Sequence, residues 1–375
     1  MSFKFLRASS SVIECHVVLL DNSQFVAMFD QETVVGDELF ERVCERLKVP
    51  SYDRQYFGLQ YIDNEDGDVN WLNLDKEIRS PRKSNPLMYQ FAVKVFPKDP
   101  LQLDQNMQKQ ILLQLKGLIN RGKFNLPVSK HASIDGFFAQ AMLGDFIPKQ
   151  HKAGYLETLL GIFYCPPTGI NSDGDIDEEK YELMVRDLHK SHRGMTREKA
   201  VSHALDICKE LPNYGGCVYY GGTDLDSGDE VVLSVSIQGI RICRLKNKFP
   251  EVGEVCHHFQ WRDVISILCD DAKLYVHLAG GAADDNDEDM SYRAFRFKKG
   301  LYSHKVAHRF KKDAENHQNF FFEENPERAR TMRSLSVDVK SLKGIRNLRS
   351  GSVGSGRQFL ASKMTLPFKR QTTKK

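Results

Sequence analysis

The chain has 375 residues, a length that suits two or three domains, and 41% of them are hydrophobic, enough to form cores. No run of about 18 apolar residues occurs, so we expect no membrane-spanning helix. The apolar stretch near the start is too short for a signal peptide, and Ser2 stands where N-myristoylation requires glycine. Together these features predict an intracellular protein.

The net charge of +3 conceals an uneven distribution of charged residues. From Arg328 to the end there are 13 Lys and Arg residues and one acid, Asp338, so this tail carries +12 and the first 327 residues carry −9. A basic tail attracts anions, which here means inner-leaflet lipid, nucleic acid or an acidic surface of the chain itself. Because residues 331–375 contain few apolar side chains, we predict that they are disordered.

The first part of the chain has the pattern of a small mixed fold. A helix is expected over residues 36–49, with Asp37 as its N-cap. Alternating or apolar stretches predict strands at residues 12–20, 24–30, 56–63, 69–74 and 88–96. This strand–strand–helix–strand order is typical of a ubiquitin-like fold. We expect Trp71 and Leu72 to anchor its core, and the acidic turn NEDGD to face solvent.

Residues 101–211 predict a helical domain. Apolar residues recur at helical spacing from Met107, and a later helix is expected to begin at a Thr196 cap. Another predicted helix buries Tyr181, Met184, Val185 and Leu188. After residue 213 the period changes to two, which predicts six or seven short strands, followed by a helix from Leu301 to about Phe322. A seven-stranded sheet closed by one helix matches the pleckstrin-homology (PH) or phosphotyrosine-binding (PTB) superfold.

Several motifs, in this order, resemble those of FERM domains of the band 4.1 superfamily. They are YFGLQYID followed by WLNLDKEI, FAVKVFPKDPLQL, ILLQLKGLINRGKFNLP, LGDFIPKQHKAGY, VSIQGIRI and HRFKKDAENHQNFF. The resemblance implies an α+β, three-lobed FERM cloverleaf. It would comprise a ubiquitin-like lobe at 12–97, an acyl-CoA-binding-protein-like helical lobe at 101–211 and a PH/PTB-like lobe at 214–322. Residues 323–375 would be a basic, disordered tail similar to a FERM-adjacent segment.

The resemblance also implies a function. It implies that this chain is a non-enzymatic membrane–cytoskeleton adaptor or scaffold that binds cytoplasmic tails of membrane proteins and phosphoinositides at the inner face of the plasma membrane, for example at cell junctions. In such a lobe a peptide can add to the edge of the fifth strand beside the last helix. We expect the peptide-binding residues to be Ile265, Ser266, Ile267, Leu268, Cys269, His304 and His308. Any link to actin would be indirect.

Two basic features are candidates for regulation by membranes. Lys305, His308, Arg309 and Lys312 fall on one face of the last predicted helix, and we expect Lys305, Arg309 and Lys312 to contact lipid headgroups. A solvated helix face is the simpler alternative. In the tail, arginines lie three residues before Ser336 and Ser352, a spacing that suits basophilic kinases.

The sequence offers little for catalysis or metal binding. The acidic loops that begin near Asp173 and Asp285 lack the glycine and glutamate spacing of an EF-hand. Cys256 and its two following histidines alternate along a predicted strand, so they cannot easily converge on a metal. Cys256 and Arg262 alone have the spacing of a tyrosine-phosphatase loop, but HHFQW between them is bulky and lacks glycine. We therefore expect no enzyme, no cofactor and no metal.

Two alternatives remain open at this stage. One is nucleic-acid binding through the basic tail, although the tail offers only Phe359 and Phe368 for base stacking, and we expect no nucleic-acid partner. The other is a relative of FERM tyrosine phosphatases that lacks the catalytic domain.

Overall fold

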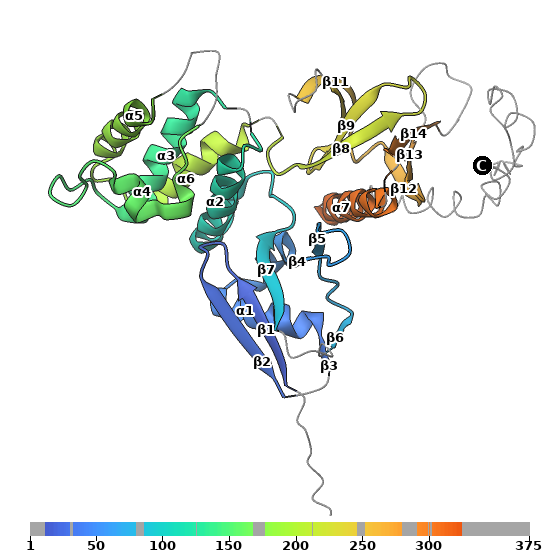
Figure 1. Ribbon diagram of the computed structural model, residues 1–375, viewed down its shortest axis with the longest axis horizontal. Coiled ribbons are helices and arrows are strands. Elements are labelled where there is room, and N and C mark those ends of the chain that lie inside the picture. Colours follow the sequence, from blue (N-terminus) through green and yellow to red (C-terminus); the bar gives the residue numbers. More distant parts are fainter. Residues whose placement is uncertain are drawn as a thin grey trace, which may run out of the picture. The chain divides into compact units, whose positions relative to one another are not determined.

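The computed structural model describes residues 12–324, apart from gaps at 31–32, 80–85, 125, 168–176, 212, 246–251, 280–290, 299 and 301. Within these residues the chain forms the three expected lobes, which follow one another along the sequence (Figure 1). The α+β fold class predicted from the sequence is therefore confirmed. No helix among the described residues is both long enough and apolar enough to cross a membrane.

Lobe 1 is a five-stranded sheet with one helix packed against it. Its sheet has the order β2-β1-β7-β4-β5, and β1 pairs with β7 in parallel. The elements are β1 (Ile13–Val18), β2 (Gln24–Phe29), β3 (Thr33–Val35), α1 (Gly36–Leu47), β4 (Phe57–Ile62), β5 (Val69–Trp71), β6 (Glu77–Arg79) and β7 (Leu87–Val93). A small separate sheet joins β3 to β6.

Lobe 2 is helical. It contains α2 (Gln105–Asn120), α3 (Val128–Leu143), α4 (Tyr155–Leu160), α5 (Glu178–Ser191) and α6 (Arg197–Lys209). The hydroxyl of Thr196 accepts a hydrogen bond from the Lys199 amide at 3.2 Å, which confirms the predicted cap. The Asp37 cap was wrong, because α1 begins at Gly36 with Val35 as its N-cap, and Asp37 lies in its first turn.

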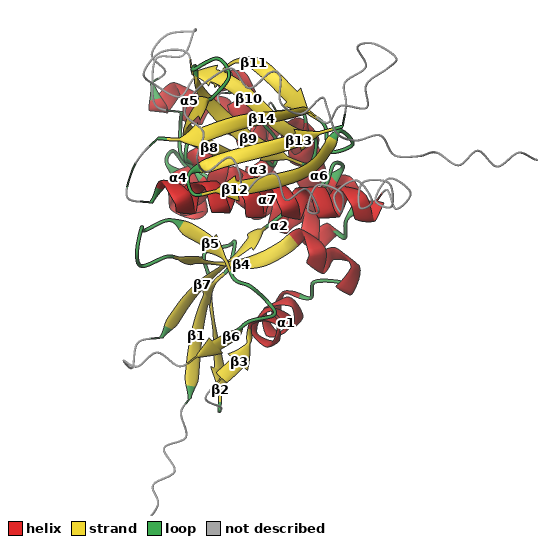
Figure 2. Ribbon diagram, turned by 90° about the vertical axis from the view of Figure 1, so that its right-hand side faces the viewer, coloured by secondary structure: helices red, strands yellow, loops and turns green. Residues whose placement is uncertain are grey.

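Lobe 3 is a seven-stranded sheet with the order β11-β10-β9-β8-β14-β13-β12, closed by one long helix. Its elements are β8 (Cys217–Asp224), β9 (Glu230–Ser236), β10 (Gly239–Leu245), β11 (Val252–Phe259), β12 (Val264–Asp270), β13 (Lys273–Leu278), β14 (Ser291–Phe297) and α7 (Ser303–Glu324). Figure 2 shows α7 against the strands of this sheet, with β5 of lobe 1 on its other side.

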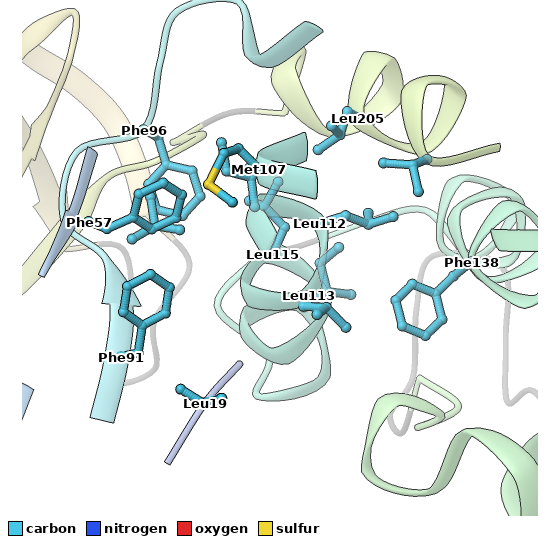
Figure 3. Packing of buried hydrophobic residues seen from close by; sticks show 14 of the residues in the cluster. Leu19, Phe57, Phe91, Phe96, Met107, Leu112, Leu113, Leu115, Phe138 and Leu205 are labelled. Carbon is cyan, nitrogen blue, oxygen red and sulfur yellow. The ribbon is translucent and has the colours of Figure 1, made fainter. Parts of the chain in front are cut away.

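Two hydrophobic cores hold these three lobes. One core runs from the sheet of lobe 1 into lobe 2, and Phe96 and Met107 lie where the two lobes meet (Figure 3). Gln114 of α2 fastens the same junction, because its Oε1 accepts a hydrogen bond from the Val93 amide of β7 at 2.6 Å. The second core belongs to lobe 3 and contains Trp261 and Phe310. Outside these two cores, lobe 3 meets lobe 1 through polar contacts of α7 and through the Tyr56 and Phe320 rings, whose centroids lie 5.0 Å apart.

Two predicted core residues lie elsewhere. Met184 is 43% exposed on the outer side of α5. Trp71 is only partly buried and does not belong to either core, because its ring packs over Gly58 and its indole N–H points to α7 of lobe 3. Leu72 does pack against the core of lobe 1, as expected.

Candidate functional site

The outer side of β12 is an open strand edge. β12 ends the strand order of lobe 3, so only one side of its backbone pairs with another described strand, β13. Asp270 and Lys273 close the two-residue hairpin between them, with Asp271 in the left-handed region at φ 54°. Hydrogen-bonding positions alternate from that closing pair, so the N–H and C=O groups of Ile267 and Cys269 point away from β13.

A side chain of α7 closes one end of this edge. Gln318 Nε2 donates to the Val264 carbonyl at 2.7 Å, next to the register shift between Val264 and Ser266. Nearer the other end, the positive charge of Lys311 acts on the Cys269 thiol, although burial is the larger effect and raises the thiol pKa. An extended segment would therefore have room along Ile267 and Cys269 rather than along the whole strand.

The predicted peptide-binding residues divide into two kinds. Ile265 and Ile267 are 5% and 4% exposed, so their side chains belong to the interior and only their backbone could meet a ligand. Ser266, Leu268 and Cys269 are partly exposed, and His304 and His308 are exposed on α7. The structure thus brings these residues to neighbouring elements, β12 and the first half of α7.

An open hollow of about 790 Å³ lies at the end of β12. It is lined by Asp270, Asp271, Lys273, Arg296, Ser303 and His304. Lys273 and Arg296 are cross-strand neighbours on β13 and β14, which places two cations side by side in its wall. The start of α7 forms another part of the wall, because Ser303 and His304 open that helix.

The predicted lipid-binding residues already have partners within the chain. Lys305 Nζ lies 3.0 Å from Asp63 Oδ2 and 2.5 Å from Glu65 Oε2. Arg309 binds Asp66 at 2.5 Å and Asp68 at 2.7 Å. The ammonium of Lys312 donates to the Trp71 carbonyl at 2.9 Å. We call this set of contacts between the β4–β5 turn and α7 the acidic clasp.

Asp66 is the most enclosed carboxylate of the acidic clasp, with a side chain only 2% exposed. Burial opposes its ionisation, but hydrogen bonds from Arg309 and from the Asp68 amide outweigh that effect and lower its pKa. Glu65 and Asp68 are 74% and 61% exposed and contribute mainly at the rim.

Asp313 extends the contact between the lobes. Its two carboxylate oxygens accept hydrogen bonds from the Trp71 indole at 3.1 Å and from the Tyr219 hydroxyl at 2.6 Å. The expectation that the acidic turn faces solvent therefore holds for Glu65 and Asp68, which stay exposed, and fails for Asp66, whose carboxylate is enclosed against Arg309 of α7. The sequence did carry a signal, namely four acids within six residues and two cations one helical turn apart, but nothing in it stated that they meet.

The structure does not support the remaining candidate sites, namely the metal-binding and phosphatase-loop residues, and it does not describe the phosphorylation sites. Within the described residues, no three His, Cys, Asp or Glu side chains are placed to hold a metal ion. Cys256 lies within β11 rather than in a loop before a helix, so Cys256 and Arg262 do not form a phosphatase loop. Ser336, Ser352 and the acidic loops near Asp173 and Asp285 lie outside the described residues.

Comparison with known protein families gives the same three lobes. The FERM N-terminal domain matches residues 17–82, the FERM central domain matches 98–219, and the FERM C-terminal PH-like domain matches 226–329. Human band 4.1-like protein 3 is 29% identical over 310 residues, which cover 82% of this chain and 26% of that protein. Band 4.1-like protein 1 of Rattus norvegicus is 28% identical over 314 residues, which cover 84% and 32%.

Solved structures share the fold. The complex of the FERM and C-terminal domains of Drosophila Merlin has a TM-score of 0.69 at 20% identity and covers 84% of this chain and 99% of that one. The human Myosin 7b MyTH4-FERM domain, solved with the harmonin-a PDZ3 domain, has a TM-score of 0.56 at 13% identity, with coverage of 84% and 60%.

A ubiquitin-like lobe, a helical lobe and a PH-like lobe, in this order, define the three-lobed fold of a FERM domain. The chain belongs to the FERM-domain proteins of the band 4.1 superfamily. It spans between 26% and 32% of the length of the curated relatives that it matches.

Proposed function

We propose that the chain is a non-enzymatic adaptor that binds the cytoplasmic tails of membrane proteins beneath the plasma membrane and connects them to the cytoskeleton. The observation that carries the proposal is the open edge of β12 beside α7, where an extended tail can add as a further strand. Membership of the band 4.1 superfamily supports the location and the adaptor role.

The backbone of Cys269 offers a direct test of strand addition. Cys269→Pro removes an N–H that points away from β13, so it should block an added strand and leave the β12–β13 pairing intact. Cys269→Ala is the matched control, because it removes only the thiol. Both variants would be probed in the full chain against an array of peptides tiled from cytoplasmic tails of membrane proteins.

We expect the peptides that bind the unmodified chain to bind Cys269→Ala equally well and Cys269→Pro about tenfold more weakly, the loss of roughly one to two backbone hydrogen bonds. Equal binding by both variants would contradict strand addition at β12.

We further propose that anionic lipid headgroups contact Lys305, Arg309 and Lys312. Because these cations are held in the acidic clasp, a headgroup must first displace the exposed carboxylates of Glu65 and Asp68. Glu65→Gln with Asp68→Asn should therefore strengthen cosedimentation with phosphoinositide vesicles. Charge reversal of Lys305, Arg309 and Lys312 should weaken it. If neither change alters cosedimentation, the lipid assignment fails, and the clasp is an internal contact alone.

A further inference from the structure

The strand β2 of lobe 1 has an open edge that lacks the features that usually protect an edge strand. It ends the order of its sheet, and among the described residues only β1 pairs with it. Its sequence, QFVAMF, has neither charge nor proline, and the β1–β2 register runs without a bulge. Natural proteins normally protect such edges with charges, prolines, bulges or very short strands. The opposite edge strand of the same sheet, β5, has only three residues.

The backbone groups that point outward can be identified. The Leu19 amide donates to the Ser23 carbonyl at 2.8 Å, so Leu19 and Ser23 form a hydrogen-bonded pair at the hairpin. Alternation along the antiparallel ladder then turns the backbone groups of Gln24, Val26 and Met28 away from β1. The Arg42 guanidinium donates to the Met28 carbonyl at 2.8 Å, which agrees with this direction.

The two sides of this edge differ in chemistry. Val26 and Met28 are 44% and 52% exposed on the face of the sheet that lies away from α1. On the α1 side, the Arg42 guanidinium lies over the Phe29 ring at 4.0 Å, and Arg46 is exposed one helical turn further along. No carboxylate of a described residue forms an ion pair with Arg42. A strand added here would meet apolar groups on one face and, on the other, the Arg42 guanidinium, which contacts a backbone carbonyl and a ring although α1 also carries Glu38, Glu41 and Glu45.

We propose that the β2 edge binds an extended segment of a partner protein in which apolar and acidic residues alternate. The apolar side chains would lie against Val26 and Met28, the carboxylates would bind Arg42 and Arg46, and the backbone would pair with Val26. A second copy of the chain is a poorer occupant. If two β2 strands paired about Val26, uncharged Gln24 of one copy would lie opposite Met28 of the other. The second copy's β2 strand would therefore bring no carboxylate to Arg42.

The probe is a nine-residue peptide of alternating valine and glutamate with blocked ends, titrated against the full chain. Its block isomer, with the same residues in two separate runs, measures non-specific attraction to the basic tail. Val26→Pro removes an outward N–H without touching the β1 ladder, and Val26→Thr keeps the backbone group as the matched control. Amide hydrogen exchange at Val26 reports strand pairing independently of affinity.

We expect the alternating peptide to bind more tightly than its block isomer and to protect the Val26 amide. Val26→Pro should weaken binding about tenfold and Val26→Thr much less. Arg42→Glu should abolish binding of the valine–glutamate peptide and favour a valine–lysine one. Arg42→Gln retains a donor for the Met28 carbonyl. It should weaken binding of the valine–glutamate peptide without favouring the valine–lysine peptide.

Equal binding of the two isomers, or binding that Val26→Pro leaves unchanged, would overturn the proposal. Dimerisation that Val26→Pro abolishes would assign the edge to a second copy and overturn it as well. Cys269→Pro distinguishes this proposal from strand addition at β12, because it should leave binding of the alternating peptide at β2 intact while it weakens binding of cytoplasmic-tail peptides.

Discussion

A buried ion pair fixes the helices of lobe 2. Lys116 Nζ lies 2.5 Å from Asp135 Oδ1, and the two side chains are 0% and 1% exposed. The Tyr181 hydroxyl donates to the other Asp135 oxygen at 2.9 Å, so α2, α3 and α5 meet at one carboxylate. A buried ion pair adds little net stability, because both charges must leave water. Removing one partner is strongly destabilising, however, because the other charge then stays in the interior without a partner.

Asp135→Asn should therefore destabilise the protein by about 3–5 kcal/mol, measured by urea unfolding. Replacing both partners, as in Lys116→Met with Asp135→Leu, should recover much of that loss because neither charge remains. Asp187→Asn, which breaks the exposed pair with Lys190, is the control and should change little. A small effect of Asp135→Asn alone would contradict this account of the pair.

His131 makes the same network sensitive to pH. Its Nδ1 contacts the Tyr181 hydroxyl, whose own proton goes to Asp135, so neutral His131 must donate from Nδ1. Burial lowers the pKa of His131 from 6.5 to about 4, and nearby Asp135 opposes this only in part. The unfolded chain therefore binds the proton more readily, and the stability contributed by His131 is present above pH 6.5 and is lost as pH falls toward 4.

We expect the urea midpoint to fall between about pH 7 and about pH 5, and His131→Gln to reduce that fall. His308→Gln, at an exposed position on α7, should leave it unchanged. A midpoint that rises on acidification, or an unaltered pH dependence in His131→Gln, would show that the titrating groups lie elsewhere.

At the scale of elements, α7 has three differently used faces. Ala307, Phe310 and Ala314 enter the core of lobe 3, His304 and His308 remain exposed, and Lys305 and Arg309 bind lobe 1. Periodicity predicted the helix itself, and its observed extent differs from the prediction by only a few residues. It grouped His308 with Lys305 and Arg309, however, because a single helix carries no information about what packs beside it.

Arg309 should be the strongest single contributor to the acidic clasp. Arg309→Ala removes hydrogen bonds to Asp66, Asp68 and Asn70, and of these the contact with the enclosed Asp66 carboxylate should matter most, because Asp68 is exposed and screened by water. We expect faster amide exchange in the β4–β5 turn and along the clasp face of α7. Lys311→Ala, which breaks an i,i+4 pair with Glu315 and leaves the acidic clasp intact, should not have this effect. Unchanged exchange in Arg309→Ala would indicate that ring contacts alone hold the junction.

The sequence predicted local features better than contacts between lobes. Strand periodicity and the Thr196 cap depend on neighbouring residues, and the cap and the longer strands were correct, whereas the three-residue strands β3 and β6 were not predicted and β5 is shorter than expected. Trp71 was assigned to a core because large aromatic residues usually lie there, yet its partner Asp313 is 242 residues away. The β12 edge could be proposed only from the resemblance, since an edge is defined by the strand order of a whole sheet. The open edge of β2 could not be predicted for the same reason.

At the scale of the molecule, the number of cores differs from the number of lobes. Phe96 and Met107 pack in one core that lobes 1 and 2 share. We predict that a fragment of residues 12–97 aggregates or remains unfolded, because it exposes the apolar surface that α2 covers. A fragment of residues 12–214, which retains Tyr214 against Phe96, should fold, giving a cooperative thermal transition and dispersed amide resonances. A stable, soluble, folded 12–97 fragment would contradict the shared core.

The shared core also constrains how such proteins can change over evolution. A recombination event between lobes 1 and 2 would join parts of the shared core that come from different proteins. Their side chains, such as those at Phe96 and Met107, would not have evolved to pack together. A crossover after Tyr214 would cut mainly polar contacts, which a few surface substitutions can rebuild. Descendants of this chain should therefore inherit lobes 1 and 2 as one unit and exchange lobe 3 more freely.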